Sequence, residues 1–159
     1  MKTLTKILIL SIVVILSSCS KNENKISKIK KIDQEDEMIA TYKEGMKNLD
    51  EGDAFYAAKK FLEAELLYPQ SDWASKSVLM ASYSYYLQNY YFEAINNLER
   101  FIKTYPKDSR MAYAHYLLGM CYYENIESEK KDLEPLVIAK MQFNIVIDNY
   151  PGTDFALDS

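Results

Sequence analysis

The stretch EAINNLERFIKTYP, residues 93–106, closes a helix-like run of apolar residues with a Tyr-Pro pair. Two further stretches close in the same way, and all three follow the spacing A-x3-[FL]-x2-[AFV]-x3-Y-P. The matching residues are Ala57, Phe61, Ala64, Tyr68 and Pro69; Ala94, Leu98, Phe101, Tyr105 and Pro106; and Ala139, Phe143, Val146, Tyr150 and Pro151. Recurrence of one pattern in a chain of 159 residues predicts a fold built from repeated units.

The apolar residues of each copy recur at i, i+4 and i+7, which places them in one stripe of an α-helix. Proline has no N–H to donate and disfavours the α conformation of the residue before it, so the Tyr-Pro pair is expected to end each helix. The segments that follow, PQSD, PKDS and PGTD, supply Ser, Thr or Asp as N-caps for the next helix. Because strand-like alternation is scarce, the pattern predicts an all-α domain.

A second helix is expected before each of these helices, after a short internal turn. The turns are LDEGD, LQNYY and, in the third unit, a longer insertion from Glu124 to Pro135. The alanines that open the three patterns lie 37 and then 45 positions apart, at Ala57, Ala94 and Ala139. Small residues upstream keep a spacing of 37, at Gly45, Ser82 and Gly119. The extra residues therefore belong to the internal turn of the third unit.

These helix pairs resemble the tetratricopeptide repeat, whose first helix carries Leu-Gly and Tyr and whose second helix carries Ala, Phe and Pro. In YLLGMCYY the third unit supplies Leu118, Gly119 and Tyr122 at the matching spacing, and the small residue is expected where the two helices pack closely. The first unit fits less well, because Glu44 and Asn48 fall where apolar residues are expected. We therefore predict an all-α tetratricopeptide-repeat solenoid of three helical pairs, with repeats at about 38–70, 74–107 and 111–152.

The N-terminus has the features of a secretory signal. Lys2 and Lys6 precede an apolar run, residues 7–16, that is too short to span a bilayer. The following residues, LSSC, resemble the bacterial lipobox, which implies that Cys19 carries a lipid; Ser20 after it favours the outer membrane. We predict a lipoprotein signal peptide over residues 1–18, a flexible lipidated tether over 19–36 and the repeat domain over 37–159.

Composition argues against catalysis and nucleic-acid binding. Loss of Lys2 and Lys6 with the signal peptide lowers the basic count from 19, while the 23 acidic residues remain. If Cys19 is lipidated, Cys121 is left as a free, buried thiol. The single histidine, His115, lies six residues before it and points to another side of the helix. With no P-loop and no metal-spaced ligand set, we predict no enzyme, no cofactor and no metal site.

The lipobox, the tether and the Tyr-Pro-closed units together resemble the BamD family, lipoproteins of the outer-membrane β-barrel assembly machinery. The resemblance covers nearly all of residues 19–159 and implies the N-terminal portion of a longer repeat protein. It also implies an adaptor at the periplasmic face of the outer membrane. The implied partners are the POTRA domains of the barrel-inserting subunit, other lipoproteins of the complex, and the C-terminal segments of unfolded outer-membrane proteins.

In such a solenoid the first helix of each pair lines the concave face. Tyrosine suits a peptide-binding groove because it combines a rigid apolar ring with a hydrogen-bonding tip. The predicted groove residues are Tyr42, Met46, Tyr83, Tyr86, Tyr113, Tyr116, Met120 and Tyr123. We expect three or four of them to pack between helices instead. Tyr85 and Tyr122 are assigned to the core, and Trp73, Arg110 and Phe155, at equivalent positions, are expected to brace successive units.

Two other functions fit the same scaffold, because a fold alone does not fix a function. One is a tetratricopeptide-repeat envelope lipoprotein that scaffolds peptidoglycan synthesis or division. The other is a carbohydrate-binding lipoprotein whose aromatic side chains stack on sugar rings.

Overall fold

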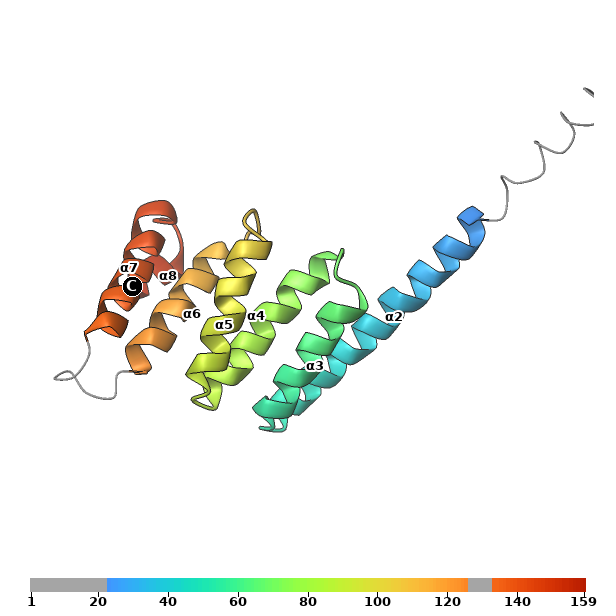
Figure 1. The fold of residues 1–159 in the computed structure, drawn as a ribbon, viewed down its shortest axis with the longest axis horizontal. Coiled ribbons are helices and arrows are strands. Elements are labelled where there is room, and N and C mark those ends of the chain that lie inside the picture. The colour runs from blue at the N-terminus through green and yellow to red at the C-terminus, as the bar shows by residue number, and fades with distance from the viewer. Residues whose placement is uncertain (1–22, 126–132) are drawn as a thin grey trace, which may run out of the picture. The chain divides into compact units, whose positions relative to one another are not determined.

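The computed structural model describes residues 23–125 and 133–159, and within these ranges it is helical with no strand (Figure 1). The helices are α2 (Glu23–Asp50), α3 (Ala54–Leu67), α4 (Asp72–Leu87), α5 (Tyr91–Thr104), α6 (Met111–Glu124), α7 (Glu134–Asn149) and α8 (Asp154–Asp158). The predicted all-α class is confirmed. The predicted signal peptide and Cys19 lie outside the described residues. None of the described helices is both long and apolar enough to cross a bilayer.

The chain divides into two units, residues 1–36 and residues 37–159. In the first unit, the described residues 23–36 of the predicted tether are helical and belong to α2. The sequence explains this helix: residues 23–44 contain neither glycine nor proline and are rich in Lys and Glu, which favour helix. The remainder of the predicted tether, residues 19–22, lies outside the described residues.

The second unit is made of consecutive packed helices. α3 packs on α4, α4 on α5, α5 on α6 and α6 on α7, while α2 contacts α3 through the rings of Tyr42 and Phe61. Figure 1 shows the same succession of neighbouring helices from α3 to α7. This is the arrangement expected of a tetratricopeptide-repeat domain, in which each helical pair buries its apolar face against its neighbours.

The repeated apolar residues form the core of the domain. Phe61 of α3, Leu98 of α5 and Val146 of α7 are fully buried, as are the alanines that open the first two patterns. Phe143 is half-buried and packs against Gly119 of α6, where the sequence predicts a close approach. The i, i+4, i+7 stripe therefore faces the interior, as predicted.

Each Tyr-Pro pair lies where a helix ends. α3, α5 and α7 stop one residue before Tyr68, Tyr105 and Tyr150, which are their C-caps. Of the predicted N-caps, Thr153 accepts a hydrogen bond from the backbone N–H of Ala156 at 3.3 Å and starts α8. Ser71 instead donates its hydroxyl back to the carbonyl oxygen of Tyr68 at 2.8 Å.

Three residues at equivalent positions connect successive repeats, as the sequence predicts. The ring of Trp73 meets that of Tyr42 edge-on, with centroids 5.1 Å apart. Arg110 donates a hydrogen bond to the Ser75 hydroxyl at 2.7 Å. Phe155 contacts Tyr116, with ring centroids 5.5 Å apart. Although the side chains differ, each one reaches back to the first helix of the preceding repeat.

Candidate peptide-binding site

One of the predicted groove residues, Tyr42, is part of the core. Only 6% of Tyr42 is exposed; its ring lies between Phe61 and Trp73, with the Lys76 ammonium 5.1 Å from its centroid. Burial raises the pKa of its phenol. The groove assignment of Tyr42 is therefore wrong. The physical reason is its register, because position 42 is equivalent to the buried Leu79 of the second repeat and so points at the second helix.

Tyr113 and Tyr116 on α6 are half-buried, and other aromatic rings pack against their side chains. The ring centroid of Phe155 on α8 lies 5.2 Å from that of Tyr113 and 5.5 Å from that of Tyr116. The ring centroid of Phe143 on α7 lies 6.1 Å from that of Tyr116. Burial is the main cause of the raised pKa of Tyr113. Tyr116 thus repeats the contacts of Tyr42, one with the second helix of its own pair and one with the helix that follows. These two residues pack between helices and present little free surface.

The remaining predicted residues are distributed over all three first helices. Met46, Tyr83, Tyr86 and Met120 are half-buried, and Tyr123 at the end of α6 is 53% exposed. α4 and α6 contact one another directly. The phenols of Tyr83 and Tyr86 are close enough to contribute to the raised pKa of Tyr113. The structure therefore brings the tyrosines of these two helices onto adjoining surfaces.

One residue of this surface was not predicted. Tyr91, the first residue of α5, lies with its ring 5.9 Å from that of Tyr86 and donates its hydroxyl to Asn89 Oδ1 at 2.8 Å. Burial and then the charge of Glu124 raise the pKa values of both phenols. The prediction was confined to first helices, and Tyr91 belongs to a second helix. The signal in the sequence is the aromatic turn LQNYY, which places a ring next to the end of α4.

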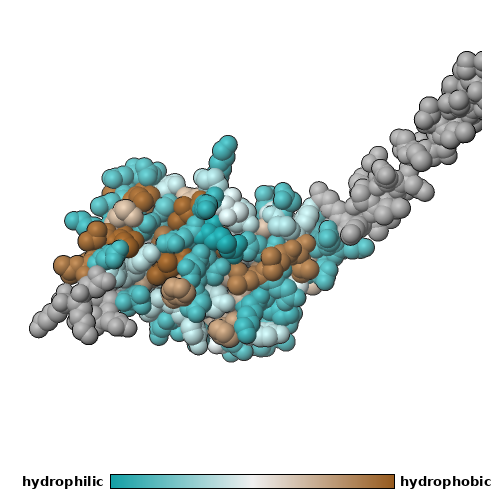
Figure 2. All heavy atoms as spheres, viewed as in Figure 1, coloured by the Kyte–Doolittle hydropathy of each residue, from teal (hydrophilic) through white to brown (hydrophobic). Residues whose placement is uncertain are grey.

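An apolar hollow of about 330 Å³ opens beside Tyr123. Leu136, Phe143 and Ile147 of α7 line it, and Lys140 lies at the same place. Figure 2 shows hydrophobic side chains gathered over α7 at this end of the molecule. Leu136 and Ile147 are each 42% exposed, so this surface presents apolar side chains to solvent. Exposed apolar patches of this kind mark interaction surfaces.

Cys121 and His115 are of residue types that often take part in acid–base or metal chemistry, but here both pack between helices of the repeats. Cys121 is a buried free thiol, as predicted, and burial raises its pKa to about 12. His115 Nδ1 lies 2.7 Å from Oε1 of Gln142, a buried side chain of α7. Within the described ranges no group of three or more His, Cys, Asp or Glu side chains is placed to hold a metal ion. The surface is suited to binding an apolar or aromatic segment.

The chain matches the family model described as "YfiO: Outer membrane lipoprotein" over residues 34–159. The outer membrane protein assembly factor BamD of Caulobacter vibrioides is 36% identical over 118 residues, which cover 74% of this chain and 39% of that relative. BamD of Rickettsia prowazekii is 34% identical over 122 residues, covering 76% of this chain and 49% of the relative. BamD of Neisseria meningitidis is 25% identical over an alignment of 163 positions, which covers 96% of this chain and 61% of the relative.

The chain thus spans less than two thirds of the length of each of these relatives. Their names describe assembly factors and no enzymatic reaction, in agreement with the prediction of a protein that is not an enzyme. The family match includes the whole helical-repeat unit, from residue 37 to residue 159. The chain belongs to the BamD family of outer membrane lipoproteins.

Proposed function

We propose that this protein is an adaptor of outer-membrane β-barrel protein assembly, held at the periplasmic face of the outer membrane by a lipid on Cys19. The family description and the names of the relatives support the assembly role. The lipobox-like segment LSSC supports the anchor. Its partners are the POTRA-containing insertase subunit, other lipoproteins of the assembly complex and segments of unfolded outer-membrane proteins.

The adaptor captures client segments on the surface formed by Met46, Tyr83, Tyr86, Met120 and Tyr123, which we call the tyrosine surface. Its chemistry favours extended segments with aromatic or aliphatic side chains, because tyrosine rings supply apolar contact area and their hydroxyls bind peptide groups. The observation that carries this proposal is the exposed ring of Tyr123 beside an apolar hollow. A surface of this kind holds a client without forming a covalent bond, so the client can be passed on.

A direct test measures how the mature protein binds a short fluorescent peptide that ends on a phenylalanine carboxylate. Tyr123→Ala is expected to weaken binding by about tenfold or more, because an aromatic anchor contributes about 2 kcal/mol. Tyr56→Ala is the matched control, since Tyr56 is 42% exposed but lies on α3. The helical circular-dichroism signal should be unchanged in both variants. Equal affinity of Tyr123→Ala and the unchanged protein would refute the peptide surface.

The partner and the anchor have separate tests. The lipidated protein, purified from its own envelope, should bring the POTRA-containing subunit with it. Recovery of a peptidoglycan synthase or a division protein instead would favour the alternative scaffold function. Cys19→Ser should move the protein from the membrane fraction to the soluble fraction; retention of the variant in the membrane would contradict a lipid on Cys19.

A further inference from the structure

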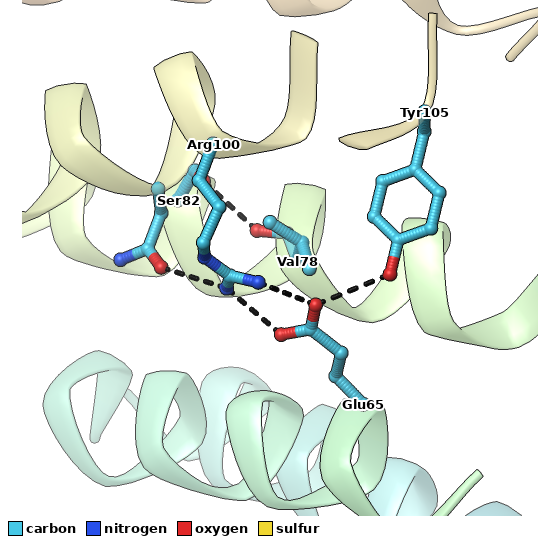
Figure 3. A network of polar contacts seen from close by, with 6 residues as sticks. Glu65, Val78, Ser82, Arg100 and Tyr105 are labelled. Carbon is cyan, nitrogen blue, oxygen red and sulfur yellow. Dashed lines mark hydrogen bonds and ion pairs between the residues drawn. The ribbon is translucent and has the colours of Figure 1, made fainter. Parts of the chain in front are cut away.

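A buried carboxylate joins the second helices of the first two repeats. Glu65 of α3 is 6% exposed, and both of its oxygens are engaged by α5 (Figure 3). Arg100 donates from Nη1 to Oε1 at 2.5 Å and from Nη2 to Oε2 at 2.8 Å. The hydroxyl of Tyr105 donates to Oε1 at 3.2 Å. A two-bond guanidinium–carboxylate pair fixes orientation as well as distance between the groups that carry it.

The guanidinium is itself held in place. Nη2 of Arg100 also donates to Oδ1 of Asn97, one turn earlier on α5, at 3.2 Å. Hydrogen bonding to Glu65 is the main cause of the raised pKa of Arg100. Burial and then the Glu65 carboxylate raise the pKa of Tyr105 to about 12. Arg100 therefore stays charged and Tyr105 stays neutral throughout the neutral range. We call the group formed by Glu65, Arg100, Tyr105 and Asn97 the clamp.

Between the first helices of these two repeats, α2 and α4, the contact is aromatic. There the first helices meet through the edge-on rings of Tyr42 and Trp73, with the Lys76 ammonium 4.7 Å from the Trp73 ring. Aromatic contacts tolerate a range of angles and offsets, whereas a two-bond ion pair does not. α3 also packs directly on α4 at this junction. The clamp adds to that packing a contact of fixed geometry between the second helices.

The next junction lacks an equivalent of this pair. The positions that correspond to Glu65 and Arg100 there are Ile102 and Ile145, both half-buried. At that junction an arginine connects the first helices instead: Arg110, next to α6, donates a hydrogen bond to the Ser75 hydroxyl of α4. The sequence thus shows that two isoleucines can occupy these positions in the same fold. Retention of a charged pair at the first junction calls for a reason besides packing, because apolar residues at such positions stabilise at least as well.

We propose that the clamp is a positioning device for the tyrosine surface, so the inference rests on the proposed function. Met46 lies on α2, Tyr83 and Tyr86 lie on α4, and a client that contacts all three must match the distance between these helices. By joining α5 to α3, the clamp acts with the packing of α3 on α4 to fix the pair α4–α5 relative to α2–α3. Residues that touch no client thereby decide how well the two parts of the surface fit one client segment.

The test replaces the clamp by the residues of the next junction. The variant is Glu65→Ile with Arg100→Ile and Tyr105→Phe, the last change avoiding an unpaired buried hydroxyl. Its melting temperature should stay within about 5 °C of the unchanged protein, because apolar residues replace a partly buried ion pair at little cost. Its affinity for the phenylalanine-ended peptide should fall roughly five- to tenfold. Arg100→Lys, which keeps the charge and loses the two-bond geometry, should give an intermediate affinity.

A distance measurement separates the inference from the function on which it rests. Spin labels are attached at the exposed positions Lys43 of α2 and Gln88 at the end of α4, in the full chain with Cys19→Ser and Cys121→Ala. The distance distribution should be narrow with the clamp intact and broad in the apolar variant. If the unchanged protein does not bind the peptide, the proposed function fails, and a broadened distribution still upholds the clamp. An unchanged distribution, or unchanged peptide affinity in a protein that binds, overturns the inference.

Discussion

Phe143 packs so closely against Gly119 that a Cβ atom at position 119 would lie 2.6 Å from Cε1 of the phenylalanine ring. The first repeat has the same relationship, with the corresponding distance from Gly45 to Cε1 of Phe61 being 2.8 Å. In the second repeat, Ser82 and Leu98 occupy the two positions. A missing side chain on the first helix is therefore matched by a large ring on the second helix. This pairing sets the distance between the helices of a repeat.

Gly119→Ala is expected to destabilise the protein by about 1–3 kcal/mol, because the ring must move into a packed interior. The free energy of unfolding, measured by urea titration followed by circular dichroism, checks this value. Gly152→Ala is the matched control, since a Cβ there meets nothing within 4 Å. Equal stability of the two variants would show that the Phe143 ring relaxes freely.

Gly119→Ser combined with Phe143→Leu should recover most of the stability lost in Gly119→Ser alone, because the pair reproduces Ser82 and Leu98 of the second repeat. The same urea titration on the two single variants and the double variant gives the coupling free energy. Additive losses would mean that the two side chains do not share one space.

Asp108 should make stability depend on acid pH. Hydrogen bonds from Arg110 hold the pKa of the Asp108 carboxyl at about 2, below its ordinary value of 3.8. The ionised carboxylate therefore stabilises the fold above pH 3.8, and this stabilisation is lost as the pH falls through about 2. Asp108→Asn should cost on the order of 1 kcal/mol at neutral pH and flatten the decline in stability over this range. Asp148→Asn, at an exposed aspartate, is the control and should leave both unchanged.

Alkali should unfold the domain cooperatively. Burial raises the pKa values of Cys121, Tyr105 and Tyr122 to about 12, above their ordinary values of 9.0 for the thiol and 10.0 for the phenols. The neutral groups thus stabilise the fold below pH 9.0, and this contribution is lost as the pH rises towards 12. The tyrosinate absorbance contributed by Tyr105 and Tyr122 should appear together with the loss of the helical signal. Ionisation of all tyrosines near pH 10 with the helices intact would contradict this expectation.

The N-cap of α3 offers a test of the turn within the first repeat. Oδ1 of Asp53 accepts a hydrogen bond from the backbone N–H of Tyr56 at 3.0 Å. Asp53→Ala should lower the free energy of unfolding by about 1 kcal/mol, because one helix-end donor loses its partner. Asp50→Ala, at the last residue of α2, removes a similar charge without a cap and should be neutral or slightly stabilising. A thermal melt of both variants decides between a capping and a charge effect.

Much of this fold was predictable from local chemistry. The i, i+4, i+7 spacing identifies the buried stripe, and it places Phe61 and Leu98 in the core, where both are fully buried. The Tyr-Pro pairs gave the helix ends to within a residue, because proline restricts its own backbone and that of its predecessor. α2 begins before Glu37, within the predicted tether, because the polar residues there have a high helix propensity.

By itself, the sequence determined which residues are helical, where the helices turn back and which positions repeat, since these depend on neighbours along the chain. It did not determine which tyrosines remain open: Tyr42, Tyr113 and Tyr116 are covered by Trp73 and Phe155, rings that arrive from a later helix. Nor did it pair Glu65 with Arg100, which are far apart in the chain. Such contacts depend on how one repeat leans on the next, and the chain acquires that geometry only when the helices pack.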